Sequence, residues 1–129
     1  MQDRPTVQEL LAAVRGFLED EVVPQLEGPR RFHALVAANV LAIVGRELEG
    51  EGESLTAEWR GLATLLGRAT GAPPAGPEAL RAAVGEMTAE LAERIRRGDA
   101  DTGPFRDAVL AHVGATVREK LRIANPRLA

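Results

Sequence analysis

The side chains that could carry chemistry in this chain are few and widely spaced. His33 and His112 are the only histidines, Ser54 is the only serine, and cysteine is absent. Thiol catalysis and thiolate metal sites are therefore excluded. No histidine or carboxylate follows either histidine three or four residues later, and a metal site usually needs three or four ligands. We expect no metal centre, no bound cofactor and no nucleophilic catalysis.

One candidate pocket involves the long apolar run from Ala34 to Val44. Asn39 is the only polar residue in this run, and Arg46 follows it by seven residues, close to two helical turns, so both lie on one face. With His33 and Glu47 at the ends of the run, these four side chains could line a ligand-binding pocket. The alternative is that Asn39 hydrogen-bonds a neighbouring helix, while the other three residues are ordinary surface and helix-end groups. His112 is expected to be a partly buried helix residue.

A second candidate site is the basic end of the chain. Arg118, Lys120 and Arg122, with Arg127 beyond them, could hold an anion or an acidic partner, or could form a solvated helix end. Residues 1–28 are acidic, so the two ends could attract each other within one chain or between two. The net charge of −3 and the scarcity of aromatic residues argue against nucleic acid as a partner.

The composition indicates the elements that must position these groups. Hydrophobic residues make up 45% of the 129 residues and aromatic residues only 3%, so the core must consist of Leu, Val, Ile and Ala. Leucine and alanine favour helices. The length suits one domain over residues 1–129. Because there is no signal-peptide pattern and no apolar run of about 20 residues, we expect a cytoplasmic protein with no membrane partner.

The apolar spacing and the helix caps predict five helices. Thr6 and Glu9 have the spacing of a capping box, and Pro24 is expected to kink or end the first helix. Ser54 is a predicted N-cap for the third helix, after a flexible acidic loop over residues 49–53. The predicted helices start near Thr6, Arg30, Ser54, Pro77 and Pro104, and the later four end near Leu48, Ala69, Gly98 and Asn125.

The second predicted helix is apolar nearly all round, a pattern typical of a helix surrounded by protein. The other helices have narrower stripes; in the fifth, the apolar residues recur every four positions from Phe105 through Val109, Val113 and Val117 to Leu121. We therefore predict an all-α bundle of about five helices packed round a buried second helix. The alanine-rich seams also permit a homodimer.

Several stretches together resemble a known family. They are residues 1–6, 9–11, 17–18, Pro24, 32–33, 36–41, 46–48, 120–121 and 125–126. They are similar to short bacterial proteins with the domain of unknown function 6285, and the likeness is weakest over residues 49–103. The resemblance implies genes that often lie beside acyl-CoA dehydrogenases and aminoglycoside-phosphotransferase-like kinases. It carries no catalytic residues.

Two functions follow from these patterns. The first is a non-catalytic accessory or protein-interaction subunit linked to acyl-CoA or phosphotransferase metabolism, with one of those enzymes as partner. The alternative is a small-ligand-binding or enzymatic helical domain, whose pocket lies near Asn39 and Arg46.

Overall fold

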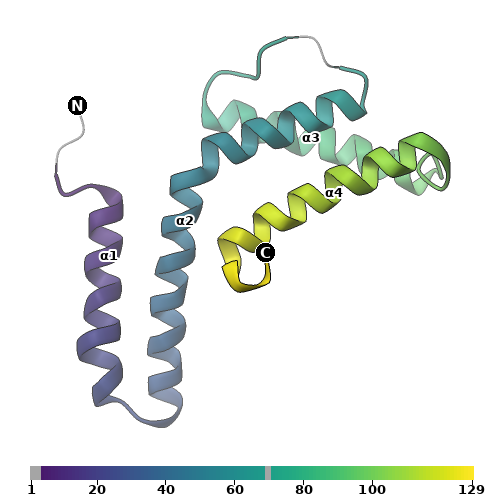
Figure 1. Cartoon of the computed structure of the whole chain (residues 1–129). Helices are drawn as coiled ribbons and strands as arrows, with labels where there is room; N and C mark the ends of the chain where they lie inside the picture. The colour runs from purple at the N-terminus through teal and green to yellow at the C-terminus, as the bar shows by residue number, and fades with distance from the viewer. Residues whose placement is uncertain (1–3, 69–70) are drawn as a thin grey trace. The chain divides into compact units, whose positions relative to one another are not determined.

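The computed structural model describes residues 4–68 and 71–129, and these residues form four α-helices and no strand. The helices are α1 (Val7–Phe17), α2 (Gly28–Leu65), α3 (Pro77–Arg96) and α4 (Gly103–Ala124) (Figure 1). The all-α prediction is confirmed. Contacts group the chain into two compact units that divide after Glu49, and each unit is described by itself. A single domain over residues 1–129 stays a prediction.

The first unit is a helical hairpin, called the hairpin unit below. α1 begins with the predicted capping box, in which the Glu9 amide donates to Thr6 Oγ1 and the Thr6 amide donates to Glu9 Oε2. A π-helical turn over Leu18–Val22 and a 3₁₀ turn over Val23–Gln25 follow, so Pro24 lies where the helical path ends. The chain then reverses, and the first part of α2 lies beside α1 (Figure 1).

Small residues hold the two helices of the hairpin unit together. Ala34, Ala38 and Gly45 on α2 are buried, and a Cβ atom at Gly45 would lie 3.2 Å from Gln8 Oε1 and 3.9 Å from Leu11 Cδ1. The alanine and glycine positions therefore let the helix backbones approach closely. They also leave little apolar volume between the helices.

The prediction of five helices is wrong, because α2 runs through the expected acidic loop over residues 49–53. Each of Gly50 and Gly52 costs a helix about 1 kcal/mol relative to alanine. Contacts of this stretch offset that cost: Glu51 pairs with Arg81 of α3, and Ser54 bonds α4. Ser54 is consequently an interior residue of α2 and not an N-cap. The expected end of the third helix at Ala69 lies outside the described residues.

The second unit, Gly50–Ala129, is called the three-helix unit and contains the end of α2, α3 and α4. α3 begins at Pro77 and ends before Gly98, and α4 ends before Asn125, as predicted. One cluster forms its core, and Leu62 is only 1% exposed. The buried members of the cluster are Leu62, Ala63, Leu66, Val84, Met87, Leu91 and Val109, and Trp59 and Phe105 pack against it.

The prediction of a buried second helix is also wrong. Ala34 and Ala38 are buried, but the larger apolar residues of the same run are exposed, with Phe32 at 64%. The exposed residues are Phe32, Leu35, Val36, Val40, Val44 and Leu48. A helix that is apolar all round needs neighbours on most sides, whereas this segment packs against only one helix of its own unit.

Candidate functional site

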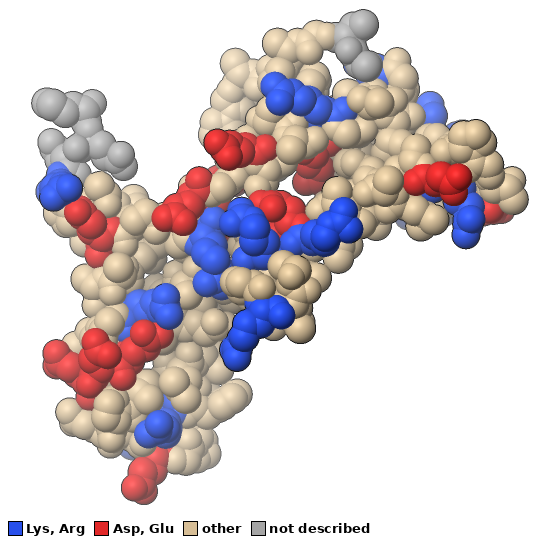
Figure 2. Space-filling model, in the orientation of Figure 1, with Lys and Arg blue, Asp and Glu red and all other residues tan. Residues whose placement is uncertain are grey.

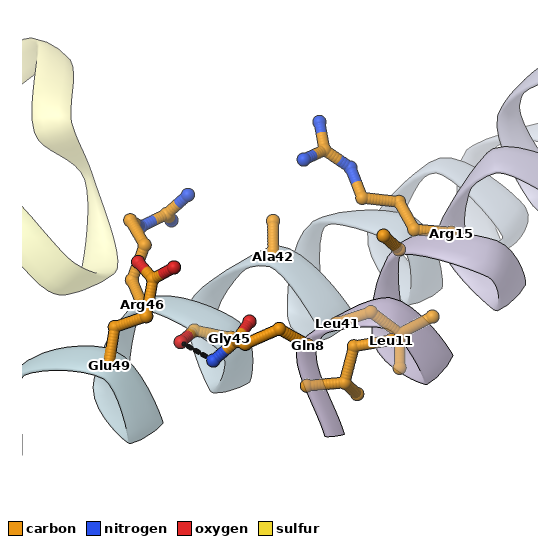
Figure 3. Close-up of a pocket in the computed structure, with 9 residues that line it drawn as sticks. Gln8, Leu11, Arg15, Leu41, Ala42, Gly45, Arg46 and Glu49 are labelled. Carbon is orange, nitrogen blue, oxygen red and sulfur yellow. Dashed lines mark hydrogen bonds between the residues drawn. The ribbon is translucent and has the colours of Figure 1, made fainter. Parts of the chain in front are cut away.

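A small open cavity lies in the hairpin unit between α1 and α2. Its volume is about 180 Å³. Leu11 and Ala42 supply apolar lining, and the Gln8 side-chain amide donates to the Gly45 carbonyl across 2.9 Å (Figure 3). Because Gly45 has no side chain, Gln8 can reach the α2 backbone there.

Two arginines stand at this cavity, Arg15 from α1 and Arg46 from α2 (Figure 3). Arg15 Nε also donates to Glu19 Oε1 at 2.9 Å, and Glu49 adds a carboxylate to the lining. Ligand pockets usually measure about 300–1,000 Å³, so this cavity suits only a small anionic group. Its lining holds no serine, threonine, histidine or cysteine, so it offers no conventional nucleophile.

The four residues predicted to form a ligand pocket are not brought together at this cavity. Arg46 lines it, but His33, Asn39 and Glu47 are exposed and are not part of the lining. The His33 ring instead lies 6.0 Å from the ring of its neighbour Phe32. Gln8 and Glu49 do line the cavity, and no motif in the sequence singles them out.

The outer face of α4 carries a different kind of site. Leu110, Val113 and Val117 are exposed, Leu110 by 56%, and they recur at spacings of three and four residues, which places them on one side of the helix. Arg106 precedes this stripe by four residues, and Lys120 follows it by three. We call these five residues the α4 stripe.

The α4 stripe corrects the sequence interpretation, which placed Val113 and Val117 on one narrow apolar stripe with Phe105 and Val109. Four residues turn a helix by slightly more than one full turn, so a repeat of four drifts round the helix by about 40° at each step. Val109 is buried and Phe105 half-buried, but Val113 and Val117 are exposed, and only Leu121 at the end of the series is half-buried.

Cationic side chains are concentrated at the C-terminal half of α4 (Figure 2). Within residues 4–68 and 71–129, neither Arg118 nor Lys120 forms an ion pair with another described residue. Arg122 differs from them, because its guanidinium donates to both carboxylate oxygens of Glu119, at 2.7 and 3.0 Å. Arg118 and Lys120 of the predicted basic patch are exposed, whereas Arg122 contributes to the fold through Glu119.

Glu119 links α4 to α2 in the three-helix unit. It accepts a hydrogen bond of 2.6 Å from Ser54 Oγ in addition to those from Arg122. The hydrogen bonds from Arg122 and Ser54 stabilise the charged carboxylate and lower the pKa of Glu119 from 4.5 to about 2. This network fastens the end of α4 to the middle of α2.

His112 is a packing residue of the same helix pair. It is half-buried, as predicted, and a Cβ atom added at Gly61 would lie only 2.6 Å from His112 Nδ1. Among the described residues, no three acidic or histidine side chains are grouped so that they could hold a metal ion. None of the described helices combines the length and the apolar character needed to cross a membrane.

Comparison with known proteins identifies the family. The model of the domain of unknown function DUF6285 matches residues 24–128. The chain belongs to the DUF6285 family. No curated protein and no solved structure matches the chain. The DUF6285 match includes the whole α4 stripe but leaves out α1, which supplies Gln8, Leu11 and Arg15 to the hairpin cavity.

Proposed function

We propose that this chain is a non-catalytic accessory subunit, acting in the bacterial cytoplasm, that binds an enzyme through the α4 stripe. The observation that carries the proposal is the exposure of Leu110, Val113 and Val117 between two cationic residues on a helix that the core holds in place elsewhere. An apolar centre with a charged rim is the usual anatomy of a protein interface.

The stripe also indicates the chemistry of its partner. Arg106 and Lys120 flank the apolar residues with positive charge, so the partner offers an apolar groove with an acidic rim. The family resemblance supports an acyl-CoA dehydrogenase or an aminoglycoside-phosphotransferase-like kinase as the partner. In this proposal, the enzyme performs the reaction and the DUF6285 chain supplies a binding surface.

Calorimetric titration with purified enzymes of these two classes tests the proposal. We expect a complex at micromolar concentration with one of them, and we expect Leu110→Gln to weaken it at least about tenfold, which corresponds to about 1.4 kcal/mol. Ile95→Gln, at an exposed position on α3, is the matched control and should leave the affinity unchanged. Absence of any complex, or equal affinities for the two variants, would contradict the proposal.

A second candidate function is the binding of a small anion in the hairpin cavity, favoured by the two arginines that stand there. A thermal-shift screen with inorganic phosphate, sugar phosphates and acyl-CoAs tests it. We expect phosphate-bearing ligands to raise the melting temperature of the chain, and Arg15→Ala to abolish that rise. If none of these compounds shifts the melting temperature, the cavity is not a ligand site.

A further inference from the structure

The hairpin unit carries an apolar face that is separate from the α4 stripe. On α1, Val7, Leu10, Val14 and Phe17 are exposed and recur at spacings of three, four and three residues. Such spacing is that of a buried helix seam in a bundle, although these residues lie in solvent. No charged residue belongs to the series.

The geometry of the hairpin places a matching series from α2 on the same side. Three of the four exposed α1 residues precede by one position a residue that lines the cavity: Val7 precedes Gln8, Leu10 precedes Leu11 and Val14 precedes Arg15. The same offset holds on α2, where Val40 and Val44 precede Leu41 and Gly45. Adjacent residues of a helix differ by about 100° of rotation about its axis. In two antiparallel helices that face each other, the residues that precede the contact positions therefore point to the same side of the helix pair.

Both series therefore form one surface, which we call the hairpin face. Its members are Val7, Leu10, Val14 and Phe17 of α1 and Ala37, Val40, Val44 and Leu48 of α2, all of them exposed. None of them is charged. A second copy of the same face would consequently meet neither like charges nor charges that have to be desolvated.

The interior of the hairpin unit explains why this face requires a cover. Its buried apolar residues are Val23, Ala34 and Ala38, which provide very little apolar volume. Units of this size seldom supply enough core to fold without a disulfide, a metal or association. Cysteine is absent, and no metal-binding cluster exists among the described residues. Burial of its exposed apolar residues against another surface would supply the apolar contacts that the interior of the hairpin unit lacks.

The area of the hairpin face matches a modest dimer interface. Transfer energies imply that a half-exposed Val, Leu or Phe side chain has roughly 50 Å² of apolar surface that a partner could still bury. The seven members of the hairpin face other than Ala37 together offer about 350 Å² on each copy. At about 65% apolar area this corresponds to an interface of about 1,100 Å² counted over both partners. Specific interfaces begin at about 1,000 Å².

We propose that a second copy of this chain covers the hairpin face, so that two hairpin units pair through a twofold axis as a four-helix bundle. Four-helix bundles are built from such antiparallel pairs, which bury one apolar face each. The interface shares no residue with the α4 stripe.

Sedimentation equilibrium of the full chain from about 1 µM to about 200 µM tests the proposal, since the small area implies a micromolar dissociation constant. We expect a monomer–dimer equilibrium. Val14→Asp should raise the dissociation constant at least about tenfold, because the carboxylate would be buried without a partner. Ala13→Asp places the same charge one residue away, outside the hairpin face, and should leave the dissociation constant within about twofold.

Circular dichroism of both variants shows whether the helices are retained; if Val14→Asp unfolds, Leu10→Gln replaces it with the same expectation. A chain that stays monomeric at about 200 µM would overturn the proposal, and so would equal dissociation constants for the Val14→Asp and Ala13→Asp variants. Binding of the hairpin face to an enzyme instead of to itself would overturn it as well. Leu110→Gln should leave the dimer intact, so failure of the dimer and failure of the enzyme complex are separately detectable.

Discussion

The two units of this chain use similar residues to opposite effect. The three-helix unit buries leucines, valines and a methionine from three helices in one cluster, whereas the hairpin unit buries chiefly alanines and leaves most of its valines and both of its phenylalanines exposed. The difference comes from the number of neighbours. Each helix in a pair can bury only one side, and a third helix provides the additional face that encloses larger side chains.

The comparison teaches that apolar character alone does not indicate where a helix is buried. α2 passes through both units, and its more uniformly apolar part is the more exposed one. In the three-helix unit its partners are α3 and α4 of the same chain. In the hairpin unit, we infer, the missing partner is another molecule.

The largest expected difference between the units concerns one leucine in each. Leu62→Ala leaves a cavity in the three-helix core and should lower the free energy of unfolding by about 2–5 kcal/mol. The Leu10 side chain is 52% exposed. At protein concentrations below the dissociation constant of the dimer, Leu10→Ala should therefore change the free energy of unfolding by less than about 0.5 kcal/mol. Far-ultraviolet circular dichroism during urea denaturation reports on the helices of both units, and the fluorescence of Trp59, the only tryptophan, reports on the three-helix unit. Equal losses for the two variants would break the comparison.

A smaller effect is expected from two glycines within the three-helix part of α2. Gly61→Ala forces its new methyl group against the His112 ring, and this overpacking should exceed the gain in helix propensity, for a net loss of about 1 kcal/mol. Gly52→Ala meets no atom within 4 Å and should instead stabilise the chain by about 0.5–1 kcal/mol. Urea denaturation measures both. Adding His112→Ala to Gly61→Ala should recover stability; without that recovery, the close approach of α4 to α2 is not what Gly61 permits.

An effect of similar size is expected from a pH dependence confined to the three-helix unit. Glu119 has a pKa of about 2 in the folded chain and an ordinary value of 4.5, so the unfolded chain takes up this proton first on acidification. Its stabilisation is complete above pH 4.5 and is lost as the pH falls toward 2. Because the Glu119 side chain is 36% exposed, solvent screening reduces the contribution to about 1 kcal/mol.

The difference in unfolding free energy between the native chain and Glu119→Gln isolates this carboxylate from the others. That difference should shrink as the pH is lowered from 5 to 2.5. A difference that stays constant over this range would show that the Ser54–Glu119–Arg122 network does not favour the charged form of Glu119.

Much of the fold could be predicted from the sequence, because local signals determine it. The capping box of Thr6 and Glu9, the helix start at Pro77 and the end before Gly98 depend on neighbouring residues, and all three are confirmed. The helix through residues 49–53 could not be predicted. It depends on contacts of Glu51 and Ser54 with residues 30 and 65 positions away, which override the weak helix propensity of Gly50 and Gly52.

The candidate sites show the same division. The basic end of α4 was apparent from composition, but the separate role of Arg122 was not, because it depends on the position of Glu119. The pocket predicted around Asn39 assumed that the second helix is enclosed, and without that enclosure Asn39 and His33 lie in solvent. The α4 stripe is not evident from the sequence, because a repeat of four residues resembles one straight face but drifts round the helix.

The most direct test of the contrast between the units is amide hydrogen exchange of the native chain at about 1 µM and about 200 µM, below and above the expected dissociation constant. Pairing of the hairpin units predicts that protection of α1 and of α2 up to Leu48 rises with concentration, while protection of α3 and α4 stays the same. Protection that is independent of concentration throughout the chain would contradict it.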